Sequence, residues 1–153
     1  MRAIILLPLH SGVRISDAVT IKPERITDGN LFLYTQKTGA PVWCPLPPVA
    51  LKALEDCDEG NPYYLWSGLG TVKSRITEWQ DRLQKVMAIA GIEGGHFHRF
   101  RDTFAVRLLQ KGVPIEAVAV LLGISVKVCS EHYSPWAKSR QDPLESAVKL
   151  AWA

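Results

Sequence analysis

The chain is poor in cysteine, and its few thiols are irregularly spaced. Only three cysteines, Cys44, Cys57 and Cys129, occur among 153 residues. A disulfide framework in a small secreted domain uses an even number of cysteines, so these three predict reduced, mostly structural thiols. The sequence therefore argues against a disulfide-stapled scaffold, and a packed apolar core must hold the fold together.

Long apolar runs and a strong excess of charge are also missing. The longest apolar stretch near the start, residues 3–9, is far shorter than the ~20 residues of a membrane-spanning helix, and no small-residue cleavage site follows it. The net charge is only +3, and an apolar content of 47% is that of an ordinary globular domain. We therefore expect one cytoplasmic domain without membrane contact, whose charge permits nucleic-acid binding without requiring it.

Helical periodicity dominates the chain, and one hairpin interrupts it. Helical patterns cover residues 2–10, 49–56, 71–90, 98–110, 114–122, 126–133 and 142–152, with a short helix starting near residue 14. In the longest pattern, apolar residues from Val72 to Ala90 recur at helical spacing and predict one buried face. Two strand-like runs, residues 31–35 and 42–44, flank a turn that carries Lys37. The sequence predicts a mostly α-helical α+β fold with one small antiparallel β-sheet.

Five side chains in separate segments make a set that phosphate chemistry can use. Arg14 lies at a corner between two helices, Lys37 at the hairpin tip, and His98 one helical turn before Arg101. Arginine holds two phosphate oxygens at once and stays protonated, and lysine can protonate a leaving oxygen. Tyr133, 32 positions after Arg101, offers a hydroxyl nucleophile. Taken singly, each of these residues has an ordinary explanation in packing, turns or surface charge.

Taken together, their order resembles the catalytic domain of the tyrosine recombinase, or phage integrase, family. The likeness lies in four segments, which are residues 12–17, the hairpin around residue 37, residues 98–105 and residues 121–133. Asp17 stands at the acidic position that braces the first arginine motif of the family. His132 precedes the tyrosine in the nucleophile region. The resemblance implies the fold of that catalytic domain.

The resemblance also implies that double-stranded DNA is cleaved and rejoined without a metal or other cofactor. Tyr133 would attack a scissile phosphate, form a 3′-phosphotyrosine bond and free a 5′ hydroxyl that attacks a partner duplex. Arg14 and Arg101 would stabilise the phosphorane, Lys37 would be the general acid, and His98 would assist proton transfer and orientation.

One position departs from the family pattern. Ile124 follows residues 121–123, where the family usually places a histidine or tryptophan. An aliphatic side chain cannot donate a hydrogen bond to a phosphate oxygen. Lys127 and His132 are near enough in sequence to substitute. A catalytically decayed remnant that still binds DNA is therefore an alternative to an active enzyme.

The resemblance covers a C-terminal catalytic domain, because family members usually begin with a helical core-binding domain. Residues 1–153 are expected to be this catalytic domain without its N-terminal partner, with weak and salt-sensitive DNA binding as a monomer. The full-length family protein would form a homotetramer on DNA. Residues 141–153, with apolar Leu144, Val148 and Trp152, predict a tail helix that docks onto a neighbouring protomer.

Other classes of function stay open at this level. Residues 115–125 have the apolar and Gly-turn pattern of a helix-turn-helix module, with residues 126–132 as its recognition helix. A tetrahedral zinc site could be built from two pairs of ligands, His96 with His98 and Cys129 with His132. A type IB topoisomerase uses the same chemistry, and plasmid relaxation without strand exchange would distinguish it.

Overall fold

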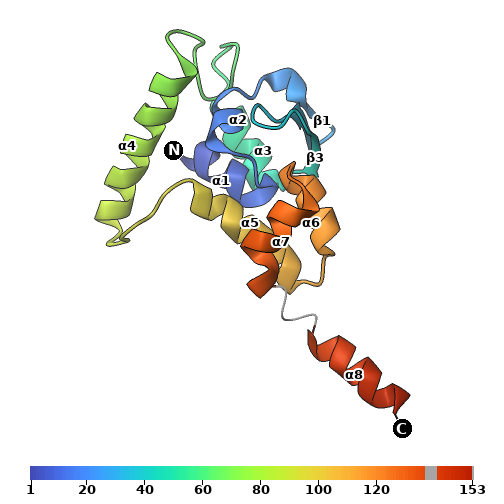
Figure 1. Cartoon of the computed structure of the whole chain (residues 1–153). Coiled ribbons are helices and arrows are strands. Elements are labelled where there is room, and N and C mark those ends of the chain that lie inside the picture. The colour runs from blue at the N-terminus through green and yellow to red at the C-terminus, as the bar shows by residue number, and fades with distance from the viewer. Residues whose placement is uncertain (137–140, 153) are drawn as a thin grey trace.

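The structure is a computed structural model that describes residues 1–136 and 141–152, although not the side chains of residues 141–144 and 147. Helices make up most of the described chain, and one small sheet lies beside them (Figure 1). In chain order the elements are α1 (Arg2–Ser11), α2 (Ile15–Val19), the 3-10 helix η1 (Pro23–Arg25), β1 (Ile26–Thr27), β2 (Asn30–Tyr34), β3 (Pro41–Pro45), α3 (Pro48–Glu55), α4 (Val72–Ile89), α5 (His98–Gln110), α6 (Ile115–Leu122), α7 (Val126–Tyr133) and α8 (Gln141–Ala151). The prediction of a mostly helical α+β fold is confirmed.

The sheet is antiparallel, with the strand order β1-β2-β3. Leu31 pairs with Cys44 and Leu33 with Val42, and all four side chains are buried against the helices. The alternate residues point outward, as the two-residue period of a strand requires. Two strands and the lysine turn were predicted correctly. The third strand, β1, was missed because it has only two residues.

The core is built around α1, which packs against α2, α3 and α5. Ile4 and Leu7 of α1 are fully buried, as are Leu109 of α5 and Leu122 of α6. Side chains three or four positions apart share one face of a helix, so the apolar spacing of α1 places both of its large residues in this core. The packing fixes the C-terminal ends of α1 and α6 close to α5, and these ends carry the site described below.

The long helix α4 begins as predicted but is less buried than expected. Thr71 caps it by accepting a hydrogen bond from the backbone of Ser74, in a reciprocal capping box. Trp79 and Leu83 are buried, whereas Val86 and Ala90 of the predicted apolar face are exposed. The prediction of one continuous buried face is therefore wrong. Its reason is geometric, because α4 packs mainly against α2 and its last turns stand clear of the other helices in Figure 1.

The tail helix α8 lies apart from the rest of the fold in Figure 1. Its Val148, Leu150 and Trp152 are exposed. The side chain of Leu144, which the sequence placed on the same apolar face, lies outside the described residues. No described helix is long and apolar enough to cross a membrane.

Candidate active site

Arg101 is the most buried charged side chain of the site, with only 3% of its surface exposed. It donates hydrogen bonds to the carbonyl oxygens of Gly12, at the end of α1, and of Leu122, at the end of α6. A helix C-terminus carries partial negative charge, so both ends favour a cation here. Burial and the neighbouring Arg14 lower the pKa of Arg101 to about 10, which leaves the guanidinium charged at neutral pH.

Gly12 and Gly123 let the two helix ends approach this arginine. Both adopt left-handed backbone conformations, with φ of 68° and 60°. A Cβ atom on Gly12 would lie 2.6 Å from a ring carbon of Phe104, and one on Gly123 would lie 2.9 Å from Cγ2 of Thr35. A larger residue at either position would push α5 or the hairpin away. The two glycines therefore serve packing and backbone geometry together.

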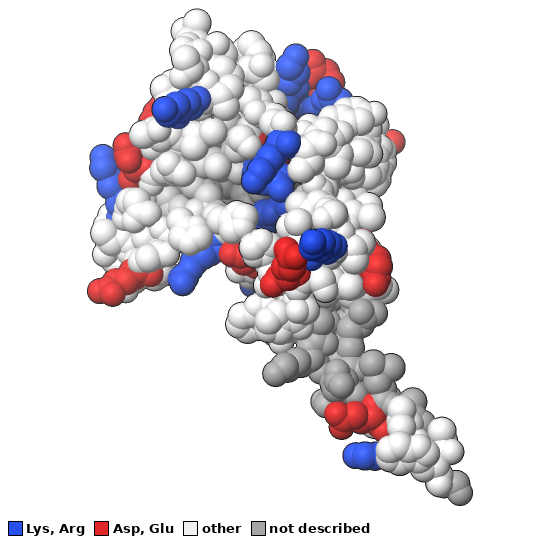
Figure 2. All heavy atoms as spheres, in the orientation of Figure 1, with Lys and Arg blue, Asp and Glu red and all other residues white. Residues whose placement is uncertain are grey.

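An open pocket of about 560 Å³ collects the residues that the sequence singled out. The residues that line it come from α2, the hairpin, α5, the α6–α7 turn, α7 and the segment after it, and are Arg14, Lys37, His98, Arg101, Asp102, Val106, Ile124, Val128, His132, Tyr133 and Trp136. Figure 2 shows Lys and Arg side chains around and inside a hollow on the face turned to the viewer. Residues up to 119 positions apart in sequence, Arg14 and Tyr133, thus meet at one place.

Arg14 reaches the pocket from the start of α2, where it is the N-cap residue. Within the described part of the chain, its buried Nη1 atom has no hydrogen-bond partner. A buried and unpaired guanidinium nitrogen costs free energy, and an anion bound in the pocket would remove that cost. The arrangement therefore favours a bound anion beside Arg14 and Arg101.

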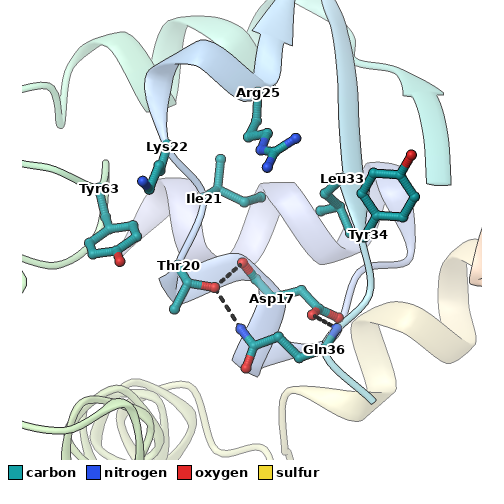
Figure 3. Close-up of a pocket in the computed structure, with 9 residues that line it drawn as sticks. All are labelled: Asp17, Thr20, Ile21, Lys22, Arg25, Leu33, Tyr34, Gln36 and Tyr63. Atoms are coloured by element: carbon teal, nitrogen blue, oxygen red, sulfur yellow. Dashed lines mark hydrogen bonds between the residues drawn. The ribbon is translucent and has the colours of Figure 1, made fainter. Parts of the chain in front are cut away.

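Lys37 is exposed in the turn between β2 and β3, and two neighbours hold that turn. The backbone N–H of Gln36 donates to Oδ1 of Asp17 at 2.8 Å, as the close-up of the adjoining pocket shows (Figure 3). Thr38 Oγ1 donates to the carbonyl oxygen of Gly123 at 2.9 Å. Asp17 is buried and does not line the pocket of Lys37 itself. It contacts the lysine turn through Gln36 instead.

Tyr133 lies at the end of α7 with its hydroxyl bound to a carboxylate. The hydroxyl donates to Oδ1 of Asp102 at 2.8 Å, and the tyrosine is 6% exposed. Burial and the hydrogen bond with Asp102 raise the pKa of Tyr133, so the phenol is protonated at neutral pH. Nε2 of His98 lies 3.5 Å from the same carboxylate oxygen. Burial lowers the pKa of His98, although the charge of Asp102 acts to raise it. The net lowering of this pKa favours a neutral imidazole ring.

Asp102 is the site residue that the sequence analysis left without a role. It lies between two residues, Arg101 and Thr103, inside a segment that the family resemblance had already marked. Its signal was the helical spacing, because His98 and Asp102 are four positions apart and so share one face of α5. Thr38 was missed likewise, although it is next to Lys37. Neither contact with a distant segment is visible in the sequence.

Ile124 and His132 both line the pocket, but in different ways. Ile124 is partly buried and its backbone N–H donates to the carbonyl of Ala119, which fixes the turn after α6. His132 is exposed on α7, and the centre of its ring is 6.2 Å from that of Tyr133. Among the described residues, no three His, Cys, Asp or Glu side chains meet as a metal site would need. The structure therefore gives the zinc alternative no support.

The sequence of this chain is similar to a known protein family and to individual members of it. The model of the phage integrase family matches residues 1–138. The chain is 31% identical over 146 residues to tyrosine recombinase XerD of Mycobacterium tuberculosis, covering 87% of this chain and 47% of that protein. It is 31% identical over 123 residues to a probable integrase/recombinase of Acholeplasma phage L2, covering 75% of this chain and 42% of that protein. The chain thus spans less than half the length of these two relatives.

Solved structures show the same fold at lower sequence identity. The catalytic domain of bacteriophage HP1 integrase matches with a TM-score of 0.69 at 20% identity, covering 96% of this chain and 79% of that one. XerH site-specific recombinase bound to a palindromic difH substrate matches with a TM-score of 0.71 at 19% identity, covering 97% of this chain and 45% of that one. With the fold of a tyrosine recombinase catalytic domain and a family match over most of its length, the chain belongs to the phage integrase family.

Proposed function

We propose that this chain is the catalytic domain of a site-specific DNA recombinase or integrase that works through a 3′-phosphotyrosine intermediate. The observation that carries the proposal is the single pocket that contains two arginines, a lysine, two histidines and a tyrosine. Membership of the phage integrase family supports the same reaction class. The chemistry below assigns one task to each side chain.

Arg14 and Arg101 would bind the scissile phosphate and stabilise the extra negative charge of the phosphorane. Guanidinium groups suit this task because they donate several hydrogen bonds in one plane and remain charged. The unpaired Nη1 atom of Arg14 supports it, as does Arg101, whose guanidinium contacts the Tyr133 hydroxyl as well as the two carbonyl oxygens and so lies beside the attacking oxygen. Fixed cations that need no rearrangement are an effective source of transition-state stabilisation.

Tyr133 would be the nucleophile, and Lys37 the general acid. The tyrosine oxygen would form a bond to phosphorus while the bond from phosphorus to the 5′ oxygen breaks, and Lys37 would give that oxygen a proton. His98 would assist proton transfer beside the phosphate. The position of Lys37 on an exposed turn supports a group that meets DNA only when the duplex is bound.

Double-stranded DNA is the proposed partner, and a homotetramer on DNA is the proposed assembly of the full-length protein. Among the solved structures that this chain matches, XerH is bound to a palindromic difH substrate in a post-cleavage complex, and λ integrase is a dimer bound to a COC′ core site. This chain alone is proposed to be a monomer that binds DNA weakly. Residues 141–153 are proposed to dock onto a neighbouring protomer, for which the exposed Val148 and Trp152 of α8 offer an apolar face.

A second candidate function is DNA binding without strand transfer. Ile124 favours it, because the pocket lacks a hydrogen-bond donor at that position. The pair α6 and α7 has the form of a helix-turn-helix, with Gly123 at the turn. However, Cys129 and Tyr133 on α7 are buried in this domain, which leaves few side chains for reading bases. This module alone also gives no role to Arg14 or Lys37.

A library of nicked duplexes with randomised sequence around the nick would test the proposal. A short strand beyond the scissile phosphate diffuses away after cleavage, so a covalent protein–DNA adduct accumulates. We expect the wild-type chain to form such an adduct, with the modified peptide containing Tyr133 by mass spectrometry. Tyr133→Phe should abolish the adduct and leave DNA binding nearly unchanged, because only the attacking oxygen is removed.

The matched control is Tyr34→Phe, since Tyr34 is an exposed tyrosine on the sheet, outside the pocket. It should form the adduct at the wild-type rate. An adduct that survives Tyr133→Phe would refute the nucleophile assignment. DNA binding by the wild-type chain without any adduct would support the binding module instead.

A further inference from the structure

Asp102 is a candidate for a role that neither the family resemblance nor the comparisons assign. It follows Arg101 on α5, and its Oδ1 atom accepts the hydrogen bond of the Tyr133 hydroxyl at 2.8 Å. The two residues are 31 positions apart and come from different helices. The contact therefore depends on how α7 folds back toward α5. It joins a carboxylate directly to the oxygen that would attack phosphorus.

The carboxylate of Asp102 is placed to accept a proton. Its side chain is 38% exposed, and Asp102 forms no ion pair with Lys or Arg in the described part of the chain. His98 is a titratable neighbour whose Nε2 lies 3.5 Å from the same oxygen, and the Arg101 guanidinium contacts the hydroxyl of Tyr133. Oδ1 accepts the tyrosine hydroxyl and is not held by a Lys or Arg side chain in the described structure. A neutral His98 can then take up or pass on a proton from the same oxygen.

Tyr133 needs such a partner. Its pKa is raised by burial, and Asp102 raises it further by holding the neutral form. A phenol that ionises reluctantly attacks phosphorus well only if a base removes its proton as the new bond forms. Protein kinases offer a parallel, because an aspartate in their catalytic loop accepts the proton of the attacking hydroxyl.

We propose that Asp102 is the general base for Tyr133, an inference that rests on the proposed strand-transfer function. During attack, the O–H bond of Tyr133 breaks and an O–H bond forms on Oδ1 of Asp102. The phenolic oxygen bonds to phosphorus, the bond to the 5′ oxygen breaks, and Lys37 supplies the proton of the leaving hydroxyl. In the reverse step the carboxylic acid returns its proton to the departing tyrosine.

The other bases of the pocket are less well placed. His98 Nε2 lies beside Asp102, and no hydrogen bond joins it to Tyr133 in the described structure. His132 is exposed, with its ring centre 6.2 Å from the tyrosine ring. Arg14 and Arg101 are cations at neutral pH and accept no proton. Among the described groups that can accept a proton, only the carboxylate of Asp102 is in hydrogen-bond contact with the attacking oxygen, since Arg101, which also contacts it, can only donate.

Asp102→Asn tests the inference, because the amide oxygen still accepts the hydrogen bond but cannot take the proton. We expect the first-order rate of adduct formation on the nicked substrate to fall by roughly 100-fold or more, the usual effect of losing a general base. DNA affinity and the thermal midpoint should change little. The matched control is Asp81→Asn, which removes an exposed carboxylate of α4 and should leave the rate unchanged.

A fluorinated tyrosine at position 133 separates a base from a structural contact. Fluorine lowers the pKa of the phenol, so the nucleophile depends less on a base. In the Asp102→Asn variant, the fluorotyrosine should raise the rate of adduct formation at least tenfold. In the otherwise wild-type chain, it should change that rate far less. Asp102→Glu, which keeps a carboxylate one methylene further out, should retain more activity than the amide variant. It also supplies a test if the asparagine variant fails to fold.

Each contrary outcome has a distinct meaning. An unchanged or faster rate in Asp102→Asn overturns the inference, and a faster one would make Asp102 a restraint on the nucleophile. A slow rate that fluorotyrosine does not recover also overturns it, because the contact would then be structural. If the wild-type chain forms no adduct through Tyr133, the proposed function itself fails and the inference falls with it.

Discussion

Arg101 donates a hydrogen bond to the carbonyl oxygen of Leu122 at 2.8 Å, and this contact joins α5 to the last residue of α6. The same guanidinium also donates to Gly12, beyond the end of α1. One side chain thus holds two helix ends, contacts the Tyr133 hydroxyl and lines the pocket in which an anion would bind. Its role in stability and its proposed role in catalysis come from one position.

Arg101→Lys should therefore affect both stability and rate. A lysine ammonium keeps the charge but cannot reach both carbonyl oxygens in the same planar arrangement. We expect a loss of about 1 to 3 kcal/mol in the free energy of unfolding, since a buried hydrogen bond is left unmade. The rate of adduct formation should fall by roughly 30-fold or more, which corresponds to about 2 kcal/mol.

Chemical denaturation would measure the loss of stability, and adduct kinetics would measure the loss of rate. The kinetics are measured well below the thermal midpoints of the wild-type chain and of Arg101→Lys, so that both proteins are folded. Arg99→Lys is the matched control, because Arg99 is exposed on the same helix and lies outside the pocket. It should change neither quantity. Wild-type stability in Arg101→Lys would mean that the two carbonyl contacts contribute little.

Much of this fold could be predicted because its signals are local. The ends of α5 and α7 agree with the periodicity of the sequence, and the turn around Lys37 follows from the strand-like runs on either side of it. The pocket residues could be selected because phosphate chemistry needs particular residue types. Their order along the chain then matched one family. These predictions required no knowledge of which segments touch.

What the sequence could not supply depends on contacts between distant segments. The bond from Tyr133 to Asp102 requires α7 to fold back on α5, and the one from Thr38 to Gly123 spans 85 positions. The exposure of Val86 was mispredicted for the same reason. Periodicity shows that a helix has an apolar face, but not how far its neighbours extend along it.

Thr38→Val should loosen the hairpin tip that carries Lys37. Valine has nearly the shape of threonine, but it cannot donate to the carbonyl oxygen of Gly123. We expect a loss of about 1 kcal/mol in the free energy of unfolding and a several-fold slower cleavage. Thr38→Ser, which keeps the hydroxyl, should preserve both.

A substrate with sulfur in place of the leaving 5′ oxygen shows whether Thr38 acts through Lys37. A thiolate leaves without a proton, so the general acid is no longer needed. The defect of Thr38→Val should then largely disappear. If it persists at full size with the sulfur substrate, the hydroxyl supports the pocket in some other way.

Deleting residues 141–153 should weaken assembly more than folding. Val148, Leu150 and Trp152 are exposed, so their removal should shift the thermal midpoint by only about 2 °C. Cooperative binding to a duplex with two adjacent half-sites, measured by gel shift, should decline more than binding to a single half-site. The control Lys149→Gln changes an exposed polar residue of α8 and should leave both intact. Equal loss of both binding modes would make the tail part of the DNA-binding domain itself.

Ile124→His should speed adduct formation if the rest of the pocket is competent. The backbone N–H of Ile124 is held by Ala119, so a histidine there would start from a fixed turn at the edge of the pocket. One added hydrogen bond to a phosphorane oxygen can contribute about 1 to 3 kcal/mol, or roughly 5- to 150-fold in rate. Ile124→Leu is the control of similar size without a donor, and it should give no gain.

The gain from Ile124→His should disappear when Tyr133→Phe or Arg101→Lys is added, because the donor acts only on a phosphate held for attack. His132→Ala in the wild-type background tests the alternative that His132 already supplies the missing hydrogen bond. If this change slows adduct formation at least tenfold while Ile124→His gives no gain, His132 has taken over the role. If neither change alters a barely detectable rate, then the site is a decayed one, and the isoleucine marks a chain that has kept the fold without the chemistry.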